Sequence, residues 1–259
     1  MTQPEKTTPI GESPSPHAEA RRAFPAGLEQ PEGSFRFSVD ALLLAAFAAI
    51  RTTDVTIRFI DLGTGCGVVG LAYLLLKRNI CQGFGMDCNP ELIAAAQNNT
   101  ANLGFSDRFA LHTGELADTR FLENLRMEAS PVQLVMANPP WRLVGSGRLP
   151  ATEARRKALF GDKGTFPLFT SSLLEEDGRF ACIISPDRLQ DMLAALDGAG
   201  LTPYLLQYIH KQKTSPATFV LIEARKGAHA KPSVAEPIAL YGPERFFTLE
   251  SLAFCPFLR

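Results

Sequence analysis

The chain has 259 residues, of which 46% are hydrophobic and 20% are charged, and its formal net charge is −1. This composition is typical of a folded globular protein and excludes a fibrous or largely disordered chain. The length is compatible with one large α/β domain. A near-neutral charge gives no general attraction to nucleic acid, so a polyanionic partner would have to meet a local basic patch.

The longest apolar run, residues 41–50, is far shorter than the ~20 residues that a membrane-spanning helix needs. The N-terminus has neither the basic start nor the apolar stretch of a secretory signal, so we expect a cytoplasmic protein without a membrane span. The five cysteines are odd in number and scattered. They favour reduced, buried thiols over disulfides or zinc ligation. We expect no metal and a monomeric state.

Residues 1–33 are rich in Pro, Ser, Thr, Glu and Gly, and they contain few large apolar side chains. Such a segment cannot repay the entropy of ordering. We therefore predict a disordered N-terminal tail over residues 1–33 and a single domain over residues 34–259.

Helical and strand-like windows alternate from residue 34 onward. Residues 39–50 are rich in the good helix formers Ala and Leu. Residues 56–61 are β-branched and aromatic and lead into a glycine cluster, as a buried strand entering a turn does. The windows that follow are helix 68–78, strand 80–87, helix 90–103, strand 108–113, helix 117–127 and strand 132–137. This alternation predicts a βαβ series and hence a parallel sheet.

A long stretch that contains Gly and Arg follows Asn138. The predicted elements after it are helix 166–176, strand 178–185, helix 187–199 and strands 203–211 and 216–224. The linker between the last two strands is too short for a crossover helix, so these strands should be antiparallel neighbours. The sequence thus predicts an α/β, Rossmann-like, doubly wound sheet of seven mostly parallel strands with a C-terminal antiparallel hairpin.

A glycine-rich loop stands between the first predicted strand and the helix after it, and its chemistry-bearing residues are Asp61, Gly63, Gly65 and Gly67. Glycines at such a junction let the backbone approach a ligand, and the first helical turn offers free N–H groups. The loop therefore predicts a nucleotide-like cofactor. The spacing Gly65-x-Gly67-x-x-Gly70 also satisfies the dinucleotide pattern, so the loop alone leaves the cofactor open.

Two acidic residues follow the next two predicted strands. Asp87 ends strand 80–87, where a carboxylate can accept hydrogen bonds from both ribose hydroxyls of a nicotinamide or S-adenosylmethionine cofactor. Glu115 follows the third strand and can either accept the amino group of a cofactor adenine or cap the next helix.

The sequence Asn138-Pro139-Pro140-Trp141 ends the fourth predicted strand, which should lie beside the first strand and the cofactor. An amino group on a purine ring is a poor nucleophile because its lone pair is delocalised. An Asn oxygen and a backbone carbonyl, held stiffly by two prolines, can accept both N–H groups and localise that pair. Trp141 offers a face for the base, which is worth ~1–3 kcal/mol per stacked base.

Together the strings DLGTGCGVVGL, GMDCNPELIAAAQNN and NPPW resemble class I methyltransferases that methylate amino groups. The upstream string FRFSVDALLL, the Ala154-Arg155-Arg156 segment and PATFVLIEARKG are similar to the bacterial YfiC-like tRNA1(Val) adenine N6-methyltransferase family. The similarity covers residues 34–226. Two departures are Trp141, where that family usually has Tyr or Phe, and Glu115, where Asp is commoner.

The resemblance implies an S-adenosylmethionine-dependent enzyme that methylates the N6 of an adenine in RNA, most directly in tRNA beside the anticodon. It implies catalytic roles for Asn138, Pro139, Pro140 and Trp141. It implies cofactor contacts from Asp61, Gly63, Gly65, Gly67 and Asp87, and we also predict cofactor contacts from Phe37, Asp40, Cys88, Glu115 and Asn138. The basic residues after the proline pair are the candidates for RNA contacts, namely Arg142, Arg155, Arg156 and Lys163, although a solvated helix face explains these charges equally well.

Four alternatives stay open. A protein glutamine N5-methyltransferase faces the same lone-pair problem, but enzymes of that kind usually carry an additional N-terminal helical domain. Methylation of amino groups in rRNA or DNA is a further alternative, and the DNA enzymes normally add a target-recognition domain. A non-catalytic RNA-binding module would not require the intact NPPW motif. A nicotinamide-dependent oxidoreductase would explain the glycines and Asp87 but would give NPPW no role.

Overall fold

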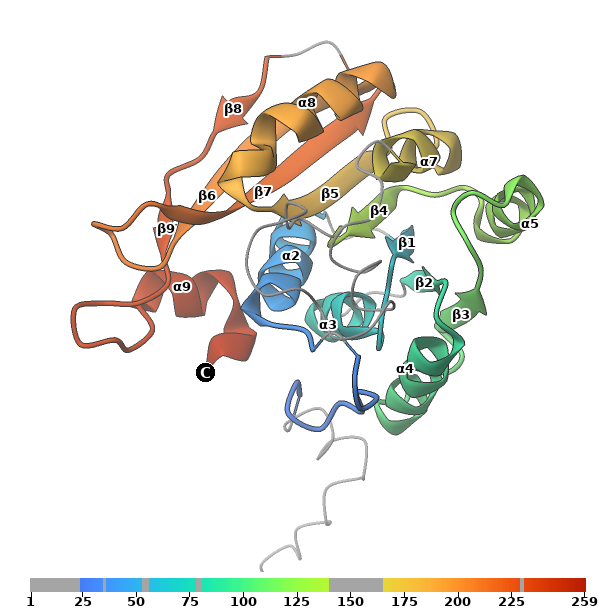
Figure 1. Cartoon of the computed structure of the whole chain (residues 1–259), viewed down its shortest axis with the longest axis horizontal. Coiled ribbons are helices and arrows are strands. Elements are labelled where there is room, and N and C mark those ends of the chain that lie inside the picture. The colour runs from blue at the N-terminus through green and yellow to red at the C-terminus, as the bar shows by residue number, and fades with distance from the viewer. Residues whose placement is uncertain (1–23, 35, 53–55, 78–80, 140–164, 229–230) are drawn as a thin grey trace, which may run out of the picture.

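The computed structural model describes residues 24–34, 36–52, 56–77, 81–139, 165–228 and 231–259. A mixed sheet forms the centre of the molecule, with helices on both faces (Figure 1). Its long strands are β1 (Arg58–Leu62), β2 (Gln82–Asp87), β3 (Phe109–Thr113), β4 (Leu134–Ala137), β5 (Arg179–Ile184), β6 (Leu201–His210) and β7 (Ala217–Lys226). None of the helices built from these residues has the length and apolar character that a membrane crossing requires.

The strand order is β3-β2-β1-β4-β5-β7-β6, with β8 (Ser233–Val234) and β9 (Ile238–Ala239) both paired to β6. Strands β1 to β5 are mutually parallel, whereas β7 pairs antiparallel with both β5 and β6. The predicted parallel sheet with its terminal hairpin is confirmed. The described chain adds the two short strands, so the sheet has nine strands rather than the expected seven.

One face of the sheet is covered by α2 (Val39–Ile50), α3 (Val68–Leu76), α4 (Pro90–Asn102) and the C-terminal α9 (Leu249–Phe254) with η2 (Pro256–Leu258). The other face is covered by α5 (Thr119–Ala129), α7 (Thr165–Leu173) and α8 (Leu189–Gly198), with η1 (Pro186–Arg188) leading into α8. Strand residues point alternately to the two faces. Phe59 therefore packs with the first set of helices and Ile60 with the second. The result is the doubly wound arrangement that the alternating pattern predicts.

Part of the predicted tail contacts the folded chain. Phe24 is buried, and its ring lies 4.9 Å from that of Phe257, measured between centroids. The backbone of Glu29 forms hydrogen bonds in both directions with the side chain of Asn99 on α4, at 2.7 and 3.0 Å. Residues 24–34 therefore pack on the domain. Composition alone does not reveal this packing, because it depends on one aromatic residue, Phe24, and one buried amide, that of Asn99. The remainder of the predicted tail lies outside the described residues.

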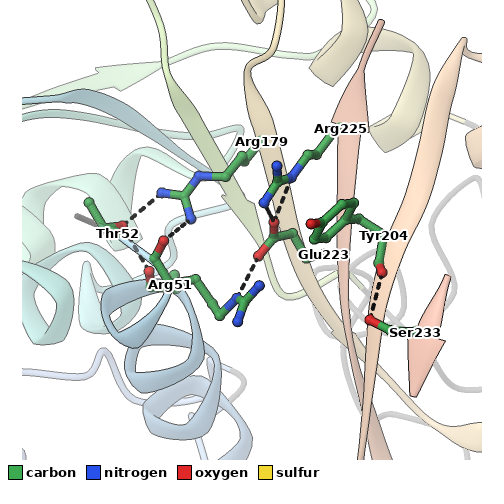
Figure 2. Close-up of polar contacts among 8 residues, drawn as sticks. Arg51, Thr52, Arg179, Tyr204, Glu223, Arg225 and Ser233 are labelled. Atoms are coloured by element: carbon green, nitrogen blue, oxygen red, sulfur yellow. Dashed lines mark hydrogen bonds and ion pairs between the residues drawn. The ribbon is translucent and has the colours of Figure 1, made fainter. Parts of the chain in front are cut away.

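The C-terminal end of α2 is held by a polar network at the amino end of β5 (Figure 2). Arg179 donates to the carbonyl oxygen of Arg51 at 2.7 Å and to Thr52 Oγ1 at 2.8 Å. The carboxylate of Glu223 on β7 accepts from Arg51 Nε at 3.2 Å and from Arg225 Nε at 2.9 Å. Only 3% of the Glu223 side chain is exposed. The network ties the helix to β5 and β7.

We predict that Glu223→Ala lowers the free energy of unfolding by about 1–3 kcal/mol, because removing a buried acceptor leaves its donors unsatisfied. The loss stays below that of a fully buried ion pair because the Arg51 and Arg225 side chains are 37% and 33% exposed and can be hydrated in the variant. Urea unfolding monitored by circular dichroism measures the change. Glu176→Ala is the control, since Glu176 pairs with Lys226 at 3.7 Å on the surface and should change stability by less than about 0.5 kcal/mol. Equal effects of the two variants would contradict the prediction.

Candidate active site

The glycine-rich loop connects β1 to α3 at the carboxyl edge of the parallel strands. Gly63, Gly65 and Gly67 have φ angles of 70°, 55° and 87°, a left-handed conformation that favours glycine. At Gly65 an added Cβ would meet no atom within 4 Å, so there is open space above the loop at this residue. At Gly67 it would lie 3.3 Å from atoms of Ala96 and Leu71, so glycine there also permits close packing of α3 against α4. The loop thus presents backbone towards open space at its tip and packs tightly at its base.

Asp61 holds this loop through hydrogen bonds to its buried side chain. Its side chain is buried, and Oδ2 accepts from Thr64 Oγ1 at 2.7 Å and from the backbone N–H of Gly70 at 3.0 Å. Burial raises the pKa of Asp61 to about 6, the two hydrogen bonds oppose that shift, and the nearby Asp87 adds to it. The carboxylate therefore connects the loop to the first turn of α3. Its expected contact with a cofactor remains a proposal.

Asp87 ends β2 and lies beside the tip of the same loop. Its Oδ2 accepts from the backbone N–H of Gly65 at 3.1 Å, and its Oδ1 accepts from that of Asn89 at 2.9 Å. Burial raises the pKa of Asp87, and these backbone hydrogen bonds oppose the shift. A third backbone hydrogen bond, from Cys88, also reaches this carboxylate. A carboxylate has about four acceptor positions, so roughly one remains free for a hydroxyl donor of a ligand.

Asn138 directly follows β4, and the register pairs Leu62 of β1 with Ala137 of β4. Asn138 and Gly63 therefore leave neighbouring strands at the same level, as the motif spacing predicts. The Asn138 Nδ2 donates to Asp40 Oδ2 at 3.0 Å, and Asp40 lies in the first turn of α2. The Asn138 Oδ1 is buried and has no hydrogen-bond partner in the described structure. The site therefore holds an acceptor atom that the described residues leave unsatisfied.

Three further residues that the sequence predicts at the site are either half-buried or exposed. Phe37 is half-buried and packs against the core beneath α2. Cys88 is exposed after β2, and Glu115 is exposed after β3. The helix that follows Glu115 is capped by Asp118, whose Oδ1 accepts from Arg120 and Phe121, so the capping alternative for Glu115 was wrong. Pro139 is buried directly after Asn138. The remaining predicted residues lie outside the described part of the chain, namely Pro140, Trp141, Arg142, Arg155, Arg156 and Lys163.

Sequence analysis missed one residue that supports the loop. Asn99 on α4 is 1% exposed, and its Nδ2 donates to the carbonyl oxygen of Cys66 at 3.0 Å. The same side chain forms the two hydrogen bonds with Glu29 described above, so it connects the glycine loop to residues 24–34. The sequence signal that could have identified Asn99 is its position on the apolar face of α4, in helical register with Ala95 and Ala96.

Comparisons with solved structures give the fold. A predicted O-methyltransferase from Agrobacterium tumefaciens superposes with a TM-score of 0.67 at 21% identity, over 85% of this chain and 96% of that one. A geranyl diphosphate methyltransferase in complex with S-adenosylmethionine superposes with a TM-score of 0.51 at 14% identity, over 71% and 85% of the two chains. The chain has a methyltransferase fold.

Curated sequences extend the comparison, although no protein-family model matches the chain. A tRNA1(Val) (adenine(37)-N6)-methyltransferase from Porphyromonas gingivalis is 29% identical over 173 residues, which is 64% of each chain. The similarity thus spans just under two thirds of that relative. A release factor glutamine methyltransferase from Caulobacter vibrioides is 34% identical over only 82 residues, 32% of this chain and 26% of that one. The resemblance stated from the motifs is confirmed.

The raised pKa of Asp61 generates a prediction about stability. Its folded pKa of about 6 exceeds the ordinary value of 3.8, so the native state binds more protons than the unfolded state between those values. The contribution of Asp61 to stability is therefore greatest below the unfolded pKa and is lost as the pH rises through 6. Asp61→Asn removes this titration, and an amide oxygen in the place of Oδ2 can still accept from Thr64 and Gly70.

We expect the free energy of unfolding of the wild type, minus that of Asp61→Asn, to increase by about 1–3 kcal/mol as the pH is lowered from about 7 to 4. Urea titrations of both proteins across this range measure the difference, in which the titrations of groups that do not interact with Asp61 cancel. A difference that stays constant or falls as the pH is lowered would show that Asp61 is not destabilised by burial of its charge.

Proposed function

We propose that this protein is an S-adenosylmethionine-dependent N-methyltransferase that methylates the N6 of an adenine in RNA, with tRNA as the expected substrate. The observation that carries the proposal is the buried, unpartnered Asn138 Oδ1 at the carboxyl end of β4, beside the glycine loop. The similarity to curated tRNA adenine N6-methyltransferases supports the choice of adenine and of tRNA.

The residues present fit the cofactor. The open space at Gly65 allows a ligand to approach the loop backbone, and Asp87 keeps roughly one acceptor position for a ribose hydroxyl. The structural neighbour in complex with S-adenosylmethionine has the same fold. When bound, S-adenosylmethionine supplies an electrophilic methyl group on a sulfonium centre. We assign Gly63, Gly65 and Asp87 to holding it, with Asp61 maintaining the loop.

Asn138 acts on the acceptor amine. Its Oδ1 can accept one N–H of an exocyclic amino group, which draws the nitrogen lone pair out of conjugation with the ring. We assign a second acceptor role to a backbone carbonyl of the proline pair, and stacking of the base to Trp141. The proton that the amine gives up can leave to solvent after methylation, so the chemistry requires no strong base.

A protein glutamine is the second candidate acceptor, because a release factor glutamine methyltransferase matches part of the chain. An amide nitrogen needs the same localisation of its lone pair, so Asn138 would act in the same way on either substrate. Tritiated methyl transfer to fractionated tRNA, rRNA, DNA and protein separates the candidates. N6-methyladenosine in tRNA supports the proposal, label only in protein supports the glutamine enzyme, and no label in any fraction contradicts methyltransferase activity.

We expect Asp87→Ala to weaken binding of S-adenosylhomocysteine by about 10- to 100-fold, because charge-assisted hydrogen bonds to the ligand are lost. Isothermal titration calorimetry measures the affinity. Asp107→Ala is the matched control, since Asp107 is an exposed aspartate in the turn before β3, at the opposite edge of the sheet, and its affinity should be unchanged. An unchanged affinity in Asp87→Ala would overturn the assignment of this carboxylate.

We expect Asn138→Ala to lower methyl transfer to tRNA by about 100-fold or more, the scale seen when one preorganised hydrogen-bonding group is removed from a reacting centre. S-adenosylhomocysteine affinity should stay within about threefold of wild type, because Asn138 is assigned to the acceptor amine. Circular dichroism and a thermal melt establish that the variant is folded. Turnover close to that of the wild type would exclude Asn138 from the reaction.

A further inference from the structure

Asp40 contacts Asn138, the residue whose side chain is assigned to the acceptor amine. It lies in the first turn of α2, is 2% exposed, and accepts from Asn138 Nδ2 at 3.0 Å. We infer that Asp40 is a positioning residue that fixes the orientation of the Asn138 amide so that Oδ1 faces the acceptor amine. The inference rests on the proposed function and deepens it, because it identifies what determines the chemistry of the Asn138 side chain.

An asparagine amide has two ends of nearly equal size and opposite hydrogen-bonding character, one that accepts and one that donates. Rotation by half a turn would present Nδ2 to the amine, and two donors would then face each other. A carboxylate only accepts, so next to Asp40 the amide must turn Nδ2 towards Oδ2 of Asp40. The oxygen is then left as the free end, which agrees with the unpartnered Asn138 Oδ1.

The carboxylate of Asp40 is itself held in place. Its other oxygen, Oδ1, accepts from the hydroxyl of Ser38, the N-cap residue of α2. The N-terminus of a helix also favours negative charge. Both oxygens of Asp40 therefore have partners within the protein, and the side chain is enclosed. These contacts favour a positioning role over the direct cofactor contact that we predict from the sequence.

The helix that carries Asp40 is fixed at its far end. Arg179 and the Glu223 network hold the C-terminal end of α2 against β5 and β7. A 12-residue helix is about 18 Å long, so it crosses the sheet from the amino edge to the carboxyl edge. Asp40 and Asn138 are 98 residues apart in the chain, and this crossing brings them together.

A cycle of four proteins tests the inference: wild type, Asp40→Asn, Asn138→Asp, and the double variant that exchanges the two side chains. In Asp40→Asn the amide at position 138 can take either orientation. In Asn138→Asp two carboxylates face each other. In the double variant the amide at position 40 donates to the carboxylate at position 138, which restores the hydrogen bond and leaves a carboxylate oxygen as the acceptor for the amine.

We expect Asp40→Asn to lower kcat for tRNA methylation by about 10- to 100-fold, the usual effect of removing a group that orients a reacting residue. S-adenosylhomocysteine affinity should stay within about threefold, which a general disturbance of the fold or of the cofactor site would not allow. The double variant should exceed Asn138→Asp by about tenfold, since contacting residues couple non-additively. Asp197→Asn, an exposed substitution of the same type on α8, is the control and should match the wild type.

Two results would overturn the inference: wild-type kcat in Asp40→Asn, or a double variant whose loss equals the product of the two single losses. Hydrogen exchange of the Asn138 side-chain amide, followed by NMR, gives a readout that needs no activity. It should be slow in the wild type and faster in Asp40→Asn, and equal rates would also overturn the inference. If the wild type methylates no substrate, the proposed function is contradicted, and the exchange rates alone then decide whether Asp40 holds Asn138.

Discussion

The attachment of α2 at both of its ends is the constraint on which the candidate site depends. At the amino edge of the sheet, Arg179 donates to the carbonyl oxygen of Arg51 at the end of the helix. Glu223 forms ion pairs with both Arg51 and Arg225 (Figure 2). At the carboxyl edge, Asp40 reaches Asn138. Because a helix is stiff along its axis, fixing one end determines where the other end lies. The position of the Asp40 carboxylate is thus set by contacts at the opposite edge of the sheet.

The second half of the site is built without α2. Asp61 and Asp87 hold the glycine loop from two neighbouring strands, one through Thr64 and Gly70 and the other through Gly65. Both carboxyl groups lie in surroundings that raise their pKa. Burial of these two carboxylates lowers the stability of the protein. The same carboxylates hold a loop whose backbone is fixed yet open at its tip. The two halves meet where β1 and β4 lie side by side.

Local patterns in the sequence predicted the long helices and strands up to residue 226 correctly, and the placement of polar residues at strand ends predicted which of them would share one edge. Asp87 and Asn138 became candidates in this way, because Asp87 ends an apolar strand and Asn138 directly follows one. The hydrogen bond between Asp40 and Asn138 could not be predicted, since no local rule joins residues so far apart in the chain. The packing of Phe24 and Glu29 was missed for a similar reason. A two-residue strand such as β8 or β9 is too short to show any periodicity.

The insertion of β7 between β5 and β6 affects the order in which the molecule can be completed during synthesis. Ribosomes add about 5–20 residues per second, and domains tend to fold from the N-terminal side as they emerge. The α2 helix is made early, yet its partner Glu223 lies 172 residues after Arg51. Until β7 has left the ribosome, one edge of β5 has no strand beside it and Arg51 lacks the carboxylate of Glu223. A nascent chain that lacks β7 therefore exposes an unpaired sheet edge, the feature that chaperones protect against intermolecular pairing.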